Sequence, residues 1–363
     1  MTREEVRKKL IELNSKHERI MVELPTGFRK TAMAIMLLDK NLGNKRFLWV
    51  VPEITLIKGM KDEFKARGAE HLVLKGDFIC YASLEKYKGS EYDYVILDES
   101  HHSFSDIRIG AIKEIKYRKL VALSATINDE IKKVLNDLGG WGSVKVTLEE
   151  AINAGELPKP TIHIIRTKLD NTIKRNKYNF EDKTSLLTDK EYYDALSKTI
   201  AYHKEIYEDE GIEYHKNLMF RIGSVRKAFL ADCKEYKVKE LVEDLGDERF
   251  ICFCGSVPQA KRLGKNVCSS LTNKGTNGKL VDAYNEGLIT NLFAKKMLQE
   301  GANLFDTQYG IIVQLENSER FLLQTLGRVL RSDNPVLYIF IVNDTIDESY
   351  LKNATINNKN LFQ

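Results

Sequence analysis

Short apolar runs alternate with helical patterns along much of this 363-residue chain. In the first half, the runs that indicate strands lie at residues 20–22, 47–51, 92–97 and 119–123, with weaker ones at 71–74 and 78–82. The helical patterns lie at residues 3–17, 32–38 and 55–66. Strands separated by helices favour a parallel α/β sheet, whose ligand sites lie at the carboxyl ends of the strands.

A second α/β series begins after the character of the chain changes near Thr161. Its strands are predicted at 161–166, 249–254, near 289–293, at 310–314 and at 336–342, and its helices at 257–266 and 318–330. The charged, tyrosine-rich stretch 189–245 has helical periodicity and contains no proline. We therefore expect three parts: a first lobe over 1–157, a connecting strand with a helical insertion over 158–247, and a second lobe over 248–363.

Composition narrows the class of protein. The chain is 43% hydrophobic and 30% charged, which is ordinary for a globular protein, and its net charge of +4 is only weak support for a polyanionic partner. The longest apolar run, 336–342, is far shorter than the ~20 residues of a membrane-spanning helix. The charged N-terminus does not resemble a signal peptide. We expect a cytoplasmic protein of a bacterial or phage-infected cell, without membrane contact. Its five cysteines lack the paired spacing of a zinc site.

The turn after the first strand has the features of a phosphate-binding loop. A strand that turns through Pro, Thr and Gly into a helix presents backbone N–H groups and a positive helix end to an anion. A lysine there reaches outer phosphates, and a following threonine hydroxyl can ligate Mg²⁺. The residues of this turn are Pro25, Thr26, Gly27, Phe28, Arg29, Lys30 and Thr31. Two positions depart from the pattern G-x-x-x-x-G-K-S/T: Leu24 and Arg29 stand where glycine is usual.

An acidic pair, Asp98 and Glu99, follows the apolar strand 92–97. Carboxylates at a strand end can hold Mg²⁺, which we assign to Asp98, and polarise a water that attacks a γ-phosphate, which we assign to Glu99. Acidic pairs also cap helices. The lysine and threonine of the phosphate turn, upstream in the same chain, favour the catalytic interpretation.

Near the other end, Gln324, Arg328 and Arg331 lie on an expected helix. The two arginines are three residues apart, so they share a face and can address one anion. Guanidinium groups stabilise the charge of a phosphoryl-transfer transition state. A solvated basic helix end is the alternative, but Gly327 would weaken such a helix by about 1 kcal/mol against alanine without a reason. Close approach of this helix to another part of the protein would be a reason for a glycine at this position.

Eight short segments in order resemble the motif series of superfamily 2 helicases and translocases. They are ELPTGFRKT, VVPE, CYASL, DESHH, SAT, FCGS, QEGAN and QTLGRVLR, and the resemblance runs from about residue 19 to 343. DESH with QxxGRxxR is most similar to the DEAH-like and type III restriction-subunit-like branch, which includes phage recombination helicases. The resemblance implies two RecA-like lobes with a helical insertion between them.

The resemblance also implies roles for individual residues. The phosphate turn and His101 would lie at the ATP site, with His101 linking it to the second lobe. Ser124 and Thr126 would couple hydrolysis to lobe movement, and Gln324, Arg328 and Arg331 would close over the nucleotide. The positions that match nucleic-acid contacts are Pro52, Glu53, Tyr81, Ser83, Gly255, Ser256 and Gly301. Loop amides and hydroxyls suit phosphate contacts, although ordinary turn chemistry explains these residues nearly as well.

Two further features bear on which residues contact nucleic acid, and the sequence does not decide between the alternatives. Lys295 replaces a threonine that is common before the Glu-Gly loop. Arg221, Arg226 and Lys227 in the helical stretch lie near aromatic residues, but a solvated helical face is the favoured interpretation.

We therefore expect an ATP-dependent motor that uses Mg²⁺ and acts on nucleic acid, with single-stranded or branched DNA preferred by family analogy, working as a monomer. The alternatives are an RNA helicase, a restriction-complex translocase subunit, or a degenerate nucleotide-binding clamp that does not hydrolyse ATP. A simple P-loop kinase would leave the second α/β series unexplained.

Overall fold

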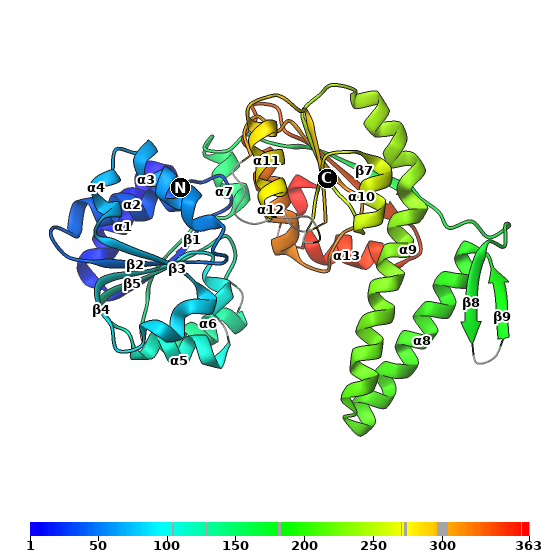
Figure 1. Ribbon diagram of the computed structural model, residues 1–363, viewed down its shortest axis with the longest axis horizontal. Coiled ribbons are helices and arrows are strands. Elements are labelled where there is room, and N and C mark those ends of the chain that lie inside the picture. The colour runs from blue at the N-terminus through cyan, green and yellow to red at the C-terminus, as the bar shows by residue number, and fades with distance from the viewer. Residues whose placement is uncertain are drawn as a thin grey trace. The chain divides into compact units, whose positions relative to one another are not determined.

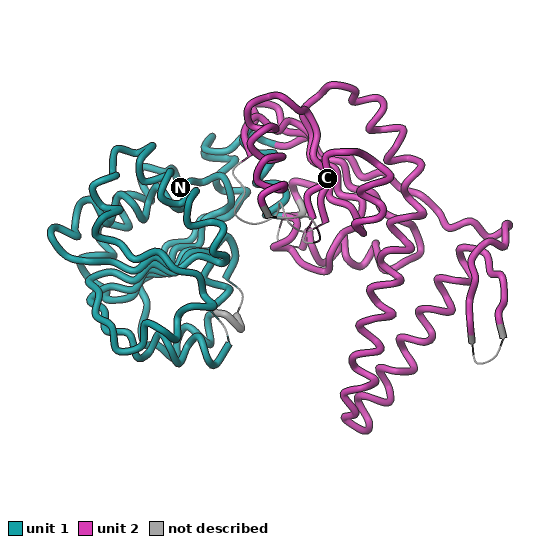
Figure 2. Tube along the Cα trace, viewed as in Figure 1, with its two compact units in different colours: residues 1–159, 301–303, 323–331 teal, residues 160–300, 304–322, 332–363 magenta. Residues whose placement is uncertain are grey.

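The computed structural model describes residues 1–103, 105–127, 129–180, 183–269, 271, 274–295, 304–356 and 358–362. They form two compact units (Figure 2). Unit 1 contains residues 1–159 and 323–331, and unit 2 contains most of the chain from residue 160 onward. Within the described part of the chain, no helix has both the length and the apolar character that crossing a bilayer requires.

Unit 1 is built on a six-stranded sheet with the order β3-β2-β4-β5-β1-β6, in which every pairing is parallel (Figure 1). Its strands are β1 Arg19–Glu23, β2 Phe47–Val51, β3 Gly76–Cys80, β4 Glu91–Leu97, β5 Lys116–Ser124 and β6 Gly142–Lys145. Strand β2 is buried along its whole length, as expected for a parallel strand covered on both faces. The helices lie on both sides of this sheet (Figure 1).

The helices of unit 1 are α1 Arg3–Lys16, α2 Lys30–Asn41, α3 Leu56–Ala66, α4 Glu70–Val73, α5 Asp106–Glu114, α6 Asp129–Asn136 and α7 Leu148–Asn153, with 3-10 turns η1 Tyr81–Tyr87 and η2 Ser100–Ser103. Two of them begin with a capping box, formed by Thr2 with Glu5 in α1 and by Thr147 with Glu150 in α7.

Unit 2 contains a second parallel sheet, with the order β11-β12-β10-β13-β14-β7. Its strands are β7 Thr161–Thr167, β10 Phe250–Phe253, β11 Val267–Cys268, β12 Asn291–Ala294, β13 Tyr309–Ile312 and β14 Val336–Val342. Its helices are α10 Val257–Leu263, α11 Lys274–Asn285, α12 Glu319–Val329 and α13 Ile346–Ala354, with a 3-10 turn η3 Lys359–Leu361. Helix α12 continues into the residues grouped with unit 1.

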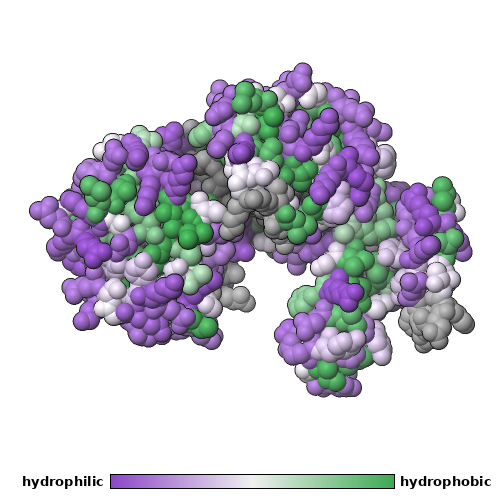
Figure 3. Space-filling model, viewed as in Figure 1, coloured by the Kyte–Doolittle hydropathy of each residue, from purple (hydrophilic) through white to green (hydrophobic). Residues whose placement is uncertain are grey.

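A long insertion interrupts unit 2 after β7. It consists of an antiparallel hairpin, β8 Asn176–Phe180 with β9 Lys183–Leu187, and two long helices, α8 Asp189–Glu210 and α9 Glu213–Leu245. Gly211 ends α8 in the left-handed conformation, which glycine adopts readily. The C-terminal half of α9 packs on the sheet of unit 2, while the rest projects from it with α8 (Figure 1). Polar and apolar side chains are interspersed on the visible face of this helical pair (Figure 3).

These observations confirm the predicted fold class, two parallel-sheet α/β units with a helical insertion. The stretch 189–245 is helical as predicted, with one break at Gly211. The prediction of a strand at 71–74 was wrong. Glu70–Val73 form one helical turn, and Leu74 beyond it is 93% exposed. A short apolar run carries no periodicity that separates a strand from a helical turn. The hairpin β8–β9 was not predicted, because its polar sequence shows no strong alternation.

Candidate functional site

The phosphate turn joins the carboxyl end of β1 to the start of α2. Gly27 has a φ of 90°, which an L side chain rarely adopts. The Leu24 N–H donates to the Ser124 carbonyl at 3.1 Å and ties the turn to the end of β5. No side chain caps the first turn of α2. Its N-terminal N–H groups and the positive helix end are therefore available to an anion.

Arg29 takes the conformation for which glycine is usual. Its φ of 67° and ψ of 44° are left-handed, and its side chain is exposed. A non-glycine residue there costs about 1–2 kcal/mol. The chain thus keeps the backbone path of a phosphate turn although it lacks that glycine, and Arg29 adds an exposed positive charge beside the turn.

Lys30 begins α2 and points inward. It is 8% exposed, and its Nζ lies 3.3 Å from the Leu24 carbonyl and 3.8 Å from Glu99 Oε1. The nearby Thr26 Oγ1 is buried without a hydrogen-bond partner among the described residues. A buried hydroxyl is normally hydrogen-bonded, so an unsatisfied one in a phosphate turn fits a place that a ligand completes.

The acidic pair follows β4 and faces this lysine. Burial, together with the adjacent Glu99, raises the pKa of Asp98 to about 7. Glu99 has a φ of 44°, so both Glu99 and Arg29 hold strained backbone conformations around the site. The buried Tyr81 hydroxyl donates to the Asp98 carbonyl at 2.9 Å. It is therefore engaged inside unit 1 and supports the acidic pair, whereas the sequence suggested a nucleic-acid contact.

A chain of side chains runs from the acidic pair to the end of β5. His101 Nδ1 lies 3.5 Å from Glu99 Oε2 and 3.3 Å from Ser124 Oγ. Ser124 Oγ in turn donates to the Thr126 carbonyl at 2.8 Å, and the Thr126 N–H reaches back to it at 3.4 Å. Because Lys30 lies beside Glu99, the phosphate turn, the DESHH segment and the Ser-Ala-Thr segment thus form one contiguous network in unit 1. His101 therefore bridges Glu99 and Ser124.

The donors at this site suit a hard divalent cation. Mg²⁺ prefers oxygen ligands and is usually bound by one or two carboxylates with substrate phosphates. The Asp98 carboxyl and the Thr31 hydroxyl are oxygen donors, at the carboxyl end of β4 and in the first turn of α2. Burial and a like-charged neighbour hold the pKa of Asp98 high, and a cation would offset both effects. The residues therefore fit Mg²⁺.

The arginine motif also contributes to unit 1. A Cβ built on Gly327 would lie 2.2 Å from Thr26 Cβ, so the approach of this residue to the phosphate turn requires glycine. Gln324 and Arg328 are buried. Burial lowers the pKa of Arg331, and Glu63 opposes that effect.

The remaining residues that the sequence predicts to contact nucleic acid lie in several separate turns and helix starts. Pro52 and the exposed Glu53 lie in the turn after β2, and Ser83 lies in η1 with its hydroxyl 3.4 Å from Cys80 Sγ. In unit 2, the Gly255 N–H donates to Gln259 Oε1 at 2.9 Å, and Ser256 caps α10. Gly301 lies outside the described residues.

Two residues that support the site were missed by the sequence analysis. Arg3 Nη2 donates to the carbonyls of Glu156 at 2.8 Å and Gly27 at 3.4 Å, and its guanidinium lies over the Phe28 ring. The Glu23 carboxylate, at the end of β1, accepts from the Ile127 N–H at 3.2 Å, next to Thr126. No local pattern marks either residue, because the partners are far away in sequence.

Known proteins resemble this chain in both sequence and fold. Residues 2–79 match the family model "Type III restriction enzyme, res subunit". The chain is 24% identical over 356 residues to the DNA 3'-5' translocase XPB2 of Sulfurisphaera tokodaii, an alignment covering 90% of this chain and 78% of that protein. Its fold is similar to the Hef helicase domain of Pyrococcus furiosus, with a TM-score of 0.55 at 13% identity over 95% of this chain and 97% of the other.

The two parallel-sheet units agree with the fold of this helicase domain. The chain is thus similar in sequence to a type III restriction subunit family and a DNA translocase, and in fold to a helicase domain, in agreement with the resemblance of its motif series to superfamily 2 helicases and translocases.

Proposed function

We propose that this protein is a nucleic-acid-dependent ATPase that couples ATP hydrolysis to movement along DNA or to its unwinding. The observation that carries the proposal is the contiguous network from Lys30 through Glu99 and His101 to Ser124 in unit 1. In a motor, ATP hydrolysis must change the conformation of residues beyond those that bind the phosphates. This network of side-chain contacts is a physical path for that coupling.

Each residue near the phosphate turn has a defined task. The N–H groups of α2 and the Lys30 ammonium bind and orient the β- and γ-phosphates. Thr31 and Asp98 would hold Mg²⁺, which neutralises phosphate charge when it is bound. Glu99 positions the attacking water and accepts its proton, since its carboxylate stands beside Lys30 and His101. Ser124 and Thr126 transmit the change at Glu99 through His101.

The arginine motif completes the proposal. We assign Gln324, Arg328 and Arg331 to the closure of the site over the nucleotide, with the guanidinium groups stabilising the charge of the transition state. The approach of Gly327 to Thr26 supports a position of this motif near the phosphate turn. Residues 1–157 would serve as the ATP-binding lobe, 158–247 as the connecting insertion and 248–363 as the second lobe.

DNA is the proposed track. The relative from Sulfurisphaera tokodaii is described as a DNA 3'-5' translocase, and this supports DNA as the partner and 3'-to-5' movement as the direction to test. Loop residues at strand ends, Pro52, Glu53, Ser83 and Ser256, would contact backbone phosphates without reading base sequence. The protein would act as a monomer.

The test is steady-state ATP hydrolysis with Mg²⁺, alone and with single-stranded DNA, duplex DNA or RNA. We expect DNA to stimulate turnover. Glu99→Gln should lower kcat by about 10²–10⁴-fold, the usual contribution of a general base, while ATP still binds. His101→Ala should keep basal hydrolysis and lose the stimulation by DNA. A wild-type protein without hydrolysis in any of these mixtures would refute the motor.

A second candidate function rests on Arg29. Because a side chain stands where glycine lets the backbone approach phosphate, the chain could instead bind nucleotide and clamp nucleic acid without turnover. Salt-sensitive binding of nucleic acid without any hydrolysis would support this clamp. RNA-specific stimulation would support an RNA helicase, and a requirement for a separate nuclease subunit would support a restriction-complex translocase.

A further inference from the structure

Trp49 in β2 buries a hydrogen-bond donor that has no partner. The side chain is fully buried, and its Nε1 makes no hydrogen bond of normal geometry with any described residue. The indole N–H is a donor only, and folding has removed it from water. A buried tryptophan N–H usually finds an acceptor.

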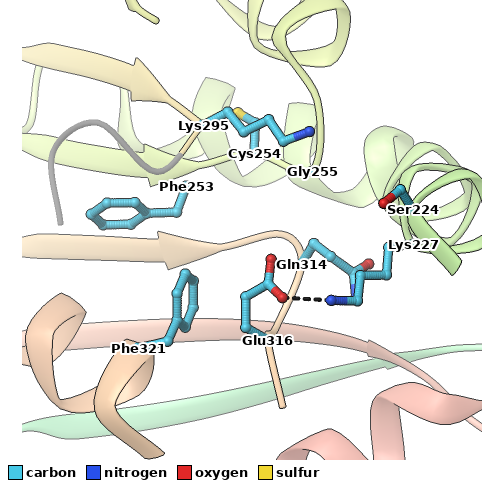
Figure 4. Close-up of a pocket in the computed structure, with 9 residues that line it drawn as sticks. All are labelled: Ser224, Lys227, Phe253, Cys254, Gly255, Lys295, Gln314, Glu316 and Phe321. Atoms are coloured by element: carbon cyan, nitrogen blue, oxygen red, sulfur yellow. Dashed lines mark hydrogen bonds and ion pairs between the residues drawn. The ribbon is translucent and has the colours of Figure 1, made fainter. Parts of the chain in front are cut away.

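Buried polar side chains of unit 2 show the usual outcome. Gln314, which lines a small cavity there (Figure 4), accepts from Lys234 at 3.0 Å and donates to Asp347 Oδ1 at 2.8 Å. Lys234 also donates to Asp347 Oδ2 at 2.8 Å, and both of these residues are fully buried. The unpartnered donor of Trp49 therefore indicates a hydrogen bond that forms in another state of its site.

The register of the sheet places Trp49 beside Asp98. Trp49 is paired with Ile96 of β4, and the Asp98 N–H continues the ladder by donating to the Val50 carbonyl at 2.9 Å. Because side chains alternate along a strand, Trp49 and Asp98 project from the same face of the sheet as diagonal neighbours, within reach of an aromatic side chain. The Phe64 ring of α3 packs edge-on to the indole, with 5.4 Å between the ring centres, and limits its movement.

The backbone of Asp98 is held on both sides, whereas its carboxylate is held at one oxygen. The Tyr81 hydroxyl donates to the Asp98 carbonyl, and Asp98 Oδ1 accepts from the Glu99 N–H at 3.0 Å. The pKa of Asp98 reports the approach of the indole. Burial raises this pKa to about 7 and Glu99 adds to that effect, whereas Lys30, the Glu99 N–H and the Trp49 N–H lower it by stabilising the carboxylate.

We propose that Trp49 is a positioning residue for the Mg²⁺ ligand Asp98, and that its indole N–H donates to the Asp98 carboxylate while that carboxylate holds the cation. The inference rests on the proposed function and deepens it, because it explains how the carboxylate keeps its orientation. A group that hydrogen-bonds a metal ligand fixes the direction of its free lone pairs. Trp49 reaches the carboxylate from inside the sheet layer, which leaves the side toward the phosphate turn to the cation.

The first test uses the indole N–H groups of the ¹⁵N-labelled full chain as reporters in NMR spectra. The chain has two tryptophans, Trp49 and Trp141, and Trp141 Nε1 already donates to the Leu135 carbonyl at 2.9 Å. Mg²⁺ with a non-hydrolysable ATP analogue should move the Trp49 indole resonance downfield, as a new hydrogen bond to a carboxylate does, and slow its exchange with water. The Trp141 resonance should stay in place, and the analogue with EDTA should not move the Trp49 resonance.

The second test measures the affinity for the cation without turnover. Trp49→Phe removes the donor and keeps an aromatic ring against Phe64. The Mg²⁺ concentration that half-saturates binding of the analogue, measured by calorimetry, should rise about 10- to 100-fold, as is usual when the partner of a metal ligand is lost. Binding of the analogue in EDTA should be unchanged. Trp141→Phe is the matched control and should keep the Mg²⁺ dependence of the wild type; it also assigns the two indole resonances.

The outcomes separate this inference from the motor. If the wild type shows DNA-stimulated hydrolysis while the Trp49 resonance ignores Mg²⁺ and Trp49→Phe needs no additional Mg²⁺, the inference fails and the motor stands. An upfield shift would place the N–H against the Phe64 ring and would also overturn the inference. If Trp49→Phe lowers only thermal stability, the role of Trp49 is structural. If this variant does not fold, the resonance of the wild type decides. A wild type that binds no Mg²⁺-nucleotide would overturn both the inference and the proposed function.

Discussion

The left-handed conformation of Arg29 gives a quantitative test of the phosphate turn. At a φ of 67°, any residue with a Cβ carries about 1–2 kcal/mol of strain. Glycine removes this strain but loses about 0.4–1 kcal/mol more on folding than alanine. Arg29→Gly should therefore make unit 1 more stable than Arg29→Ala, by up to about 1.6 kcal/mol. The two variants lose the same exposed charge, so the comparison between them isolates the backbone.

Tryptophan fluorescence during denaturant unfolding measures this difference in unit 1. The two tryptophans of the chain, Trp49 and Trp141, both lie in unit 1, and Trp49 is fully buried. The KM for ATP, measured in parallel, should be lower for the glycine variant than for the alanine variant, because the backbone can approach phosphate. If the glycine variant is less stable than the alanine variant, or if their KM values are the same, the strain argument is wrong.

Three further predictions follow from particular contacts. Lys234→Ala leaves the Asp347 carboxylate buried without its cation and should cost about 3–5 kcal/mol, whereas Lys234→Met with Asp347→Leu should cost much less; thermal unfolding distinguishes them. His203 and His215 approach to 2.8 Å between their Nδ1 atoms, and burial together with His215 lowers the pKa of His203. Folding therefore favours neutral His203, so the folded state is stabilised above the unfolded pKa of about 6.5 and loses that stabilisation as the pH falls. Amide hydrogen exchange near the end of α8 should be faster at about pH 5.5 than at about pH 7.5. The variant His215→Gln should reduce this difference. Arg3→Ala should raise the KM for ATP several-fold through a loosened phosphate turn, with Arg3→Lys intermediate; unchanged KM values would remove Arg3 from the site.

Local patterns determined the elements on which the site is built. The apolar runs at 47–51 and 336–342 are strands because β-branched and aromatic side chains suit a buried sheet. The phosphate turn was recognisable because its residues act together within a few positions, at a strand end before a helix. The order of the motifs along the chain was also enough to predict two α/β units and a helical insertion.

Tertiary structure decided what local patterns cannot encode. Sequence showed Glu99 and His101 in one motif and Ser124 in another, but the position of β5 between β4 and β1 brings His101 and Ser124, 23 residues apart, within 3.3 Å. The Lys234–Asp347 pair spans 113 residues, and no periodicity in either helix indicates it. Periodicity reports which face of an element is buried, whereas the contacts of that face depend on which distant element covers it.

Arg29 shows both what the local sequence determines and what only the tertiary structure decides. From the sequence, this residue looked like a defect in the phosphate turn, because glycine is the residue that usually tolerates a left-handed backbone. The fold holds Arg29 in that conformation, with its side chain in solvent and with the turn tied to β5 through Leu24. Sequence therefore determined where the turn lies, and the surrounding structure decided that the turn keeps its shape, because tertiary contacts can offset a local strain of about 1–2 kcal/mol.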